Sequence, residues 1–172
     1  QILGAAIELM ASDAASVQML EADDTSLRLL AWTNFHPDSA AFWQRVAVGT
    51  GSTCSRALRD NERVVVADIE ACEFMGGTPD QQEYRRSGIR AVQSTPLRSR
   101  SGRPLGMLST HWRAPHTPTD EDFTFFDVLA RQAADLIERT LAEEALRESE
   151  ERFRAIANTA PVMIWMSDVE KQ

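Results

Sequence analysis

The sequence predicts an α+β fold, in which a central antiparallel β-sheet is flanked by helices and followed by a long C-terminal helix. β-prone runs occur in consecutive pairs joined by short segments of turn composition, and strands joined in this way pair antiparallel. Between Pro118 and Pro161 the chain contains neither Gly nor Pro, which permits one uninterrupted helix. The 172 residues, 43% of them hydrophobic and 26% charged, are enough for one buried core with an extension.

The first helix and two hairpins follow from the periodicity of apolar residues. These residues recur at helical spacing over residues 2–10, so the chain opens on a helix. Residues 16–21 and 27–33 are β-prone, and the turn-forming residues between them predict a hairpin. Residues 90–97 and 105–113 form a second such pair around a loop rich in Ser and Arg. Both hairpins are expected to contribute antiparallel strands to the sheet.

The segments between the hairpins are expected to cover the sheet. We interpret residues 35–48, which are rich in aromatic side chains, as a short helix with loops. Ser52 is placed to cap a brief helix, and residues 63–67 have the composition of a short buried strand. Residues 80–87 predict a polar helix that ends at Gly88, because glycine permits a left-handed stop.

A long helix is predicted at the end of the chain. Thr119 and Asp122 match a carboxylate variant of the capping box, so we expect this helix over residues 120–158. Its length would be on the order of 60 Å, whereas a domain of about 140 residues is roughly 30 to 35 Å across. We therefore expect the helix to extend beyond its own domain and to pair with a second copy as a coiled coil. Its apolar face is made by Phe123, Phe126, Leu129, Ala130, Ala133, Ile137 and Leu141.

The composition excludes several classes of function. A net charge of -8 disfavours nucleic acid as a partner, because phosphate binding needs clustered Lys and Arg. No run approaches the roughly 18 to 20 consecutive apolar residues that span a bilayer, so we expect no membrane insertion here and a cytoplasmic location, with any anchor elsewhere in the parent protein. Cys54 and Cys72 lack CxxC spacing and the histidines are scattered, so no metal site is indicated and both thiols are expected to be unreactive.

Four sequence blocks carry a resemblance to a known family. They are residues 48–58 (VGTGSTCSRAL), 63–68 (RVVVAD), 88–97 (GIRAVQSTPL) and 102–111 (GRPLGMLSTH). In sequence and order, across residues 2–140, they resemble the GAF domains of bacterial sensor kinases. The resemblance implies a GAF-like central antiparallel sheet flanked by helices, with a long C-terminal signalling helix.

A second resemblance covers only the end of the chain. Residues 148–156 and 160–168 are similar to the leading helix and first strand of a PAS domain, and we expect the chain to end within that domain. The expected organisation is therefore a GAF sensory domain over residues 1–140, a signalling helix over 141–158, and the start of a PAS domain over 149–172.

The GAF resemblance implies where a ligand would bind. In this family a small molecule lies between one face of the sheet and the covering segments, here residues 35–55 and 68–88. Which face of the sheet this is stays open, and core packing is the alternative role for Trp43 and Tyr84. No catalytic residue, metal ligand or specific cofactor is indicated, and the ligand would be an unidentified small molecule. The candidate contacts are Phe35, Trp43, Cys54, Phe74, Met75 and Tyr84 from the cover, and Gln93, Thr95, Ser109 and His111 from the strands.

The function implied by the resemblance is regulatory rather than catalytic. The chain is expected to be the sensor domain of a two-component signal transduction protein, whose parent is a sensor histidine kinase. Homodimers would form through the N- and C-terminal helices and pass the signal to the PAS and kinase domains. One alternative is a ligand-free module that dimerises and spaces other domains. The other is a thiol-dependent enzyme like the GAF-related methionine sulfoxide reductases, for which only Cys54 and Cys72 are available.

Overall fold

The central sheet is antiparallel throughout, as the sequence predicts. A computed structural model describes residues 1–159 of the protein. Its six strands lie in the order β3-β2-β1-β6-β5-β4, and every neighbouring pair runs antiparallel. The two predicted hairpins supply the four central strands. The strands are β1 (Ala14–Leu20), β2 (Ser26–Thr33), β3 (Arg45–Ala47), β4 (Val64–Val66), β5 (Ala91–Arg98) and β6 (Pro104–Trp112).

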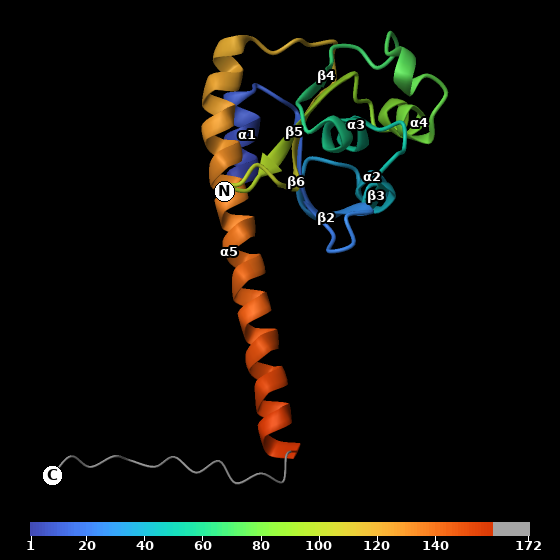
Figure 1. The fold of residues 1–172 in the computed structure, drawn as a ribbon. Helices are drawn as coiled ribbons and strands as arrows, with labels where there is room; N and C mark the ends of the chain where they lie inside the picture. Colours follow the sequence, from blue (N-terminus) through green and yellow to red (C-terminus); the bar gives the residue numbers. More distant parts are fainter. Residues whose placement is uncertain (160–172) are drawn as a thin grey trace, which may run out of the picture. The chain divides into compact units, whose positions relative to one another are not determined.

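Helices lie on both sides of this sheet. Figure 1 shows α1 and the first part of α5 on one side, which we call the helix face, and α2, α3 and α4 on the other, which we call the cover face. This arrangement divides the buried side chains of the central strands into two sets. The helices are α1 (Ile2–Leu9), α2 (Pro37–Phe42), α3 (Thr53–Asp60), the short 3₁₀ helix η1 (Glu73–Met75), α4 (Pro79–Arg86) and α5 (Asp120–Thr159).

The cover helices begin and end at residues with the expected capping chemistry. The Ser52 hydroxyl accepts a hydrogen bond of 3.1 Å from the Ser55 amide at the start of α3. Thr78 caps α4 in the same way, with 3.2 Å to the Gln81 amide. The chain leaves α4 through Gly88, whose φ of +71° lies in the left-handed region that glycine adopts without strain. These turns hold the cover segments against the sheet.

Helix α5 begins at the predicted capping box. The Asp122 carboxylate accepts hydrogen bonds from the amide and the hydroxyl of Thr119, while the Thr119 hydroxyl accepts from the Asp122 amide. The helix comprises 40 residues and includes the predicted range of 120–158. In the compact unit Gln1–Glu138 it buries an apolar stripe. The buried residues of this stripe are Phe126, Leu129, Ala130, Ala133, Ala134 and Ile137.

The second unit, Arg139–Gln172, is helical as far as it is described. Ion pairs four residues apart, such as Arg139 with Glu143 and Arg147 with Glu151, line its surface. The strand that the PAS resemblance implies near residues 161–168 lies outside the described residues.

Two further details of the sheet are the glycine at position 106 and the short edge strand β3. A Cβ atom at Gly106 would lie 2.1 Å from the Gln18 carbonyl oxygen, so the approach of β1 to β6 requires glycine. Strand β3 was not predicted, and its residues 45–47 fall in the segment interpreted as a helix with loops. It is only three residues long and pairs with β2 at the sheet edge, so it shows no alternation that would identify it.

Candidate ligand-binding site

A small chamber is enclosed between the cover face of the sheet and the cover segments. In the strand register Ser16 lies opposite Ser109, and Ala14 lies opposite His111, so these side chains share one face. Helix α3 packs over the same face, because the Thr53 hydroxyl lies 2.9 Å from that of Ser94. The chamber measures ≈ 10 Å³, room for about one water molecule. It is lined by Ser16, Gln18, Phe35, Val46, Trp43, Ser52, Cys54, Asp80, Tyr84 and His111.

Aromatic rings form much of the chamber wall. The ring centroids of Trp43 and Tyr84 are 4.7 Å apart, and those of Phe35 and Trp43 are 5.4 Å apart. Phe35 meets the His111 ring edge-on at 4.8 Å. All four side chains are buried, and they come from the loop before α2, the end of α2, α4 and β6. Edge-on and tilted contacts of this kind hold the rings in place.

His111 is a buried, neutral imidazole. Burial lowers the pKa of His111 to about 3, and a hydrogen bond with the Ala14 backbone opposes this shift only in part. That bond favours the protonated form, so the ring donates it. Within residues 1–159 the Nδ1 atom has no hydrogen-bond partner. A neutral imidazole that donates from one nitrogen keeps the other as an acceptor, so the ring retains hydrogen-bonding capacity that the described chain does not use.

Gln18 carries a second unused acceptor in the same chamber. Its Nε2 donates to the Trp43 carbonyl oxygen over 3.4 Å, which sets the orientation of the amide. The Oε1 atom is buried and meets no partner in the described part of the chain. A buried acceptor left unpaired costs about 1–3 kcal/mol. Gln18 and His111 thus both mark the chamber as a place where a partner is missing.

Asp80 is the acidic group of the chamber. The Trp43 indole donates a hydrogen bond of 3.2 Å to the Asp80 Oδ1 atom. Burial raises the pKa of Asp80, and the bond from Trp43 lowers it in part. The raised pKa reflects a carboxylate whose negative charge is poorly compensated. None of the described residues that line the chamber is a Lys or an Arg.

The two cysteines have the surroundings of protonated thiols. Cys54 lies 3.4 Å from the Ser94 hydroxyl and 3.6 Å from that of Ser109, and burial raises the pKa of its thiol. Burial also raises the pKa of Cys72. Both are free. Nucleophilic cysteines need a lowered pKa, so the structure gives neither thiol the activation that catalysis would require.

The structure does not bring all ten predicted contacts together. Phe35, Trp43, Cys54, Tyr84 and His111 line the chamber. Ser109 lies beside Cys54 on the same face. Met75, fully buried, and Phe74, partly buried, belong to the surrounding apolar core rather than to the chamber wall.

Gln93 and Thr95 lie on the helix face, away from the chamber. The strand register pairs Ser94 with Ser109, and therefore turns Gln93 and Thr95 the opposite way. The Gln93 Nε2 donates to the Thr110 hydroxyl over 3.1 Å, and its Oε1 accepts from the Thr95 hydroxyl over 2.7 Å. Gln93 and Thr95 therefore do not share a face with Ser109 and His111, and alternation within one strand does not reveal this, because it leaves the register with the next strand open.

Sequence reasoning did not assign four polar residues of the chamber to the site: Ser16, Gln18, Ser52 and Asp80. Ser16 and Gln18 alternate with apolar residues in β1, and that spacing places both on one face. Asp80 follows Pro79 in the first turn of α4, where acidic residues are common for helix-dipole reasons alone. Its burial depends on contact with Trp43, far away in the sequence, and no local signal marks it.

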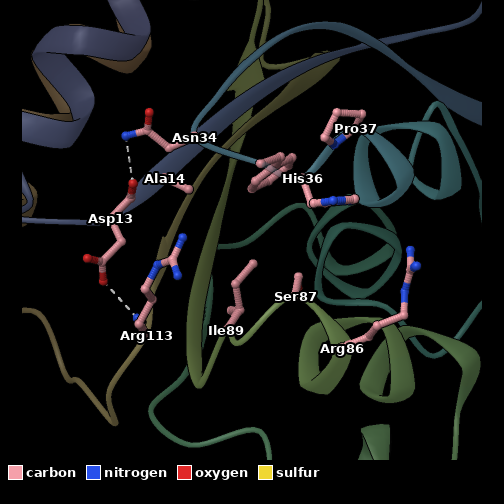
Figure 2. A pocket seen from close by; sticks show the side chains of 10 residues that line it. Asp13, Ala14, Asn34, His36, Pro37, Arg86, Ser87, Ile89 and Arg113 are labelled. Atoms are coloured by element: carbon pink, nitrogen blue, oxygen red, sulfur yellow. Dashed lines mark hydrogen bonds between the residues drawn. The ribbon is translucent and has the colours of Figure 1, made fainter.

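An open cleft adjoins the chamber and shares Phe35 with it. The cleft measures ≈ 670 Å³. Figure 2 shows its floor and rim, where the Asn34 side chain donates to the Asp13 carbonyl and the Arg113 amide donates to the Asp13 carboxylate. Phe35 is the residue that lines both the chamber and this cleft. The cleft is lined by Asp13, Ala14, Asn34, Phe35, His36, Pro37, Arg86, Ser87, Ile89 and Arg113.

Residues 1–159 contain no cluster of three or more His, Cys, Asp or Glu side chains arranged to hold a metal ion. Over the same range, no helix combines the length and the apolar character needed to cross a bilayer.

The fold and the enclosed chamber define an α+β domain in which helices cover both faces of one antiparallel sheet. The GAF domain family matches residues 1–138, and the chain belongs to this family. The fold predicted from the sequence is therefore confirmed.

Solved structures share this fold at low sequence identity. A domain of a protein described as a two-component sensor histidine kinase from Sinorhizobium meliloti has a TM-score of 0.66 and 21% identity, over 85% of this chain and 92% of that one. The GAF domain of a phosphoenolpyruvate-protein phosphotransferase from Coxiella burnetii has a TM-score of 0.70 and 19% identity, over 84% and 82%. A type II free methionine-R-sulfoxide reductase from Thermoplasma acidophilum has a TM-score of 0.63 and 19% identity, over 81% and 90%. These likenesses establish the fold alone.

One curated relative is similar in sequence. The methyl sulfide methyltransferase-associated sensor of Methanosarcina acetivorans is 31% identical over 104 residues. The matched region is 60% of this chain but only 10% of that protein.

Proposed function

We propose that this GAF domain is a regulatory sensor that binds a small molecule in the chamber and passes the signal through α5. The observation that carries this proposal is the pair of buried acceptors, Gln18 Oε1 and His111 Nδ1, which lack partners within residues 1–159. Both face one chamber with aromatic walls. A pocket with apolar walls and a few convergent polar groups is the usual form of a small-molecule site.

Binding requires the chamber to open. Its ≈ 10 Å³ is far below the roughly 300 Å³ or more of typical ligand pockets. Phe35 lines both the chamber and the open cleft, and it lies just before α2 rather than within a helix or strand. Displacement of this ring would join the two spaces. The ligand would then favour an open state of the cover that is rarely populated without it.

Strand β5 connects the chamber side to α5. Ser94 bonds to Thr53 and Ser109 on the cover face. Its neighbour Thr95 accepts a hydrogen bond of 2.7 Å from Arg63 on the helix face, and Arg63 forms an ion pair with Asp127 of α5. A shift of β5 under the cover would therefore reach α5 through polar contacts as well as through packing.

The output is proposed to be dimeric. Leu146, Phe153 and Ile156 are 62%, 69% and 65% exposed, and their spacing of seven and three residues matches the a and d positions of a coiled coil. Two copies joined through the N- and C-terminal helices would cover these side chains. In the parent protein, which we propose is a sensor histidine kinase, the signal would continue to a PAS domain and then to the kinase.

A ligand screen tests this function against its alternatives. Thermal shift measurements with a metabolite panel should find a compound that raises the melting temperature, and His111→Phe, which fills the chamber, should abolish that rise. A spacer without a ligand would show no rise with any compound. A methionine sulfoxide reductase would show turnover that Cys54→Ser or Cys72→Ser removes, and the raised pKa values of both thiols lead us to expect none.

A further inference from the structure

We propose that the ligand of this chamber is a small organic ammonium ion that carries at least one N–H group. The inference rests on the proposed function, and it names the class of ligand for the same site. Three independent properties of the chamber lead to it: the direction of its free hydrogen bonds, the sign of its charge, and the aromatic faces around it.

The free hydrogen-bonding capacity of the chamber is accepting. Gln18 has its Nε2 on the Trp43 carbonyl, so the atom left without a partner in the described chain is the oxygen. His111 is a neutral imidazole, which has one donating and one accepting nitrogen, and its buried Nδ1 has no partner in the described chain. A ligand that satisfies both groups must bring hydrogen-bond donors. An ionised carboxylate has only acceptors to offer them.

The charge of the chamber points in the same direction. Asp80 is 7% exposed and lines the chamber, and among its described neighbours there no Lys or Arg offsets the carboxylate. A ligand cation would compensate this charge, whereas an anion would add a second uncompensated charge to a buried site. The side chain that bonds to Asp80 is the Trp43 indole, a neutral group.

The aromatic walls suit a cation as well. Trp43, Tyr84 and Phe35 lie with neighbouring ring centroids 4.7 Å and 5.4 Å apart. An ammonium group is attracted to a ring face when it lies within about 6 Å of the centroid, and the attraction grows as water is excluded. Since these rings and Asp80 line one enclosed space, a single bound cation would contact both.

The size of the ligand is limited by the closed chamber. A chamber of ≈ 10 Å³ must gain volume by displacement of wall side chains that also line open clefts, Phe35 on one side and Trp43 on another, so amines with few carbon atoms are favoured over large ones. Methylated and short alkyl ammonium ions meet all of these requirements. Tetramethylammonium meets the charge and ring requirements but has no N–H group for Gln18 and His111.

Isothermal titration calorimetry and thermal shift assays on the chain test the ligand class. The probes are methylammonium, dimethylammonium, trimethylammonium, ethylammonium and tetramethylammonium chloride, with sodium acetate and sodium phosphate at matched ionic strength and neutral pH. We expect saturable binding of at least one N–H ammonium ion. Tetramethylammonium should bind at least tenfold more weakly, and acetate and phosphate should not bind to the chamber.

Matched variants locate the site. Asp80→Asn keeps an oxygen for the Trp43 indole but removes the charge, and it should weaken binding at least tenfold. Gln18→Met removes the accepting oxygen but keeps a side chain of similar size. It should also weaken binding, through the loss of a hydrogen bond rather than of a charge. Asp24→Asn is the control, because Asp24 is an exposed turn residue with a φ of +55° that Asn also tolerates. It should leave binding unchanged.

The outcomes separate this inference from the function on which it rests. Binding of acetate or phosphate that depends on His111, or equal binding to Asp80→Asn, would overturn the ammonium class. Equal affinity for tetramethylammonium and trimethylammonium would overturn the role of the two acceptors. The inference fails and the sensor function stands if no amine binds but another compound raises the melting temperature of the unmodified protein and not that of His111→Phe. If no compound of any class does so, the sensor function fails as well.

Discussion

The two faces of the sheet differ in how completely their buried polar side chains are hydrogen-bonded. On the helix face, both ends of the Gln93 amide are bonded, to Thr110 and Thr95, and the chain of contacts continues to Arg63 and Asp127. On the cover face, Gln18 and His111 each keep one buried atom without a partner in residues 1–159. Both faces place polar residues in buried strands, so polarity alone does not identify a site. The difference lies in whether the partners are present.

This contrast has an energetic meaning. A complete network in a buried environment resists substitution, because removing one member leaves the others unpaired. An incomplete one already carries the cost of its unpaired atoms, so an apolar replacement of similar shape recovers part of that cost. The helix face is therefore expected to hold the domain together and fix α5, and the cover face to hold a site at the expense of stability.

Truncating one phenylalanine on each face should give the largest difference. Phe126 of α5 is fully buried, and Phe126→Ala should destabilise the domain by about 3–5 kcal/mol, because the space it leaves is closed. The destabilisation caused by Phe35→Ala should be smaller than that of Phe126→Ala by at least about 1 kcal/mol, because the space left at Phe35 opens to the cleft and admits water. Urea unfolding followed by circular dichroism measures both. Equal costs would mean that Phe35 is ordinary core rather than a movable wall.

The buried imidazole predicts a loss of stability as the pH falls. The folded-state pKa of His111 is about 3, below its ordinary value of 6.5, so between these values the unfolded chain binds a proton that the folded chain does not. Stability then decreases with falling pH by about 1.4 kcal/mol per unit in this window. The free energies of unfolding of the unmodified protein and of His111→Leu should therefore move apart by about 2 kcal/mol between pH 7 and pH 5, in favour of the variant.

The remaining titrating groups serve as the internal control of this comparison. The lowered pKa values of carboxyls such as Asp68 and Asp122 also make acid destabilising, but both proteins carry them, so they cancel from the difference. A difference that stays constant from pH 7 to pH 5 would contradict a buried, neutral His111.

Much of the fold was predictable because its signals are local. The hairpins and the caps at Ser52 and Thr119 depend on residues close in sequence. Strand β3 was missed, since three residues at an edge carry no period.

The site was predictable only in part, because it depends on contacts between distant segments. The aromatic residues of the cover were found from their type, and five of the ten predicted contacts line the chamber. The inclusion of Gln93 and Thr95 failed on strand register, which alternation does not determine. Asp80 was missed because its burial against Trp43 joins residues 37 positions apart.

Replacing one glutamine on each face gives the smallest effect and the most direct test of the contrast. Gln93→Leu should destabilise by about 1–3 kcal/mol, because Thr110 and Thr95 lose their partner in a buried place. Gln18→Leu should change stability by less than about 1 kcal/mol, since it gives up one long bond of 3.4 Å and also removes the unpaired oxygen. Both substitutions replace glutamine with leucine at a buried position in a central strand. The two variants therefore differ in the face of the sheet on which the replaced side chain lies. If urea unfolding gives equal costs, an ordered water must already satisfy Gln18 in the free protein, and the chamber would then hold solvent in place of a vacant ligand contact.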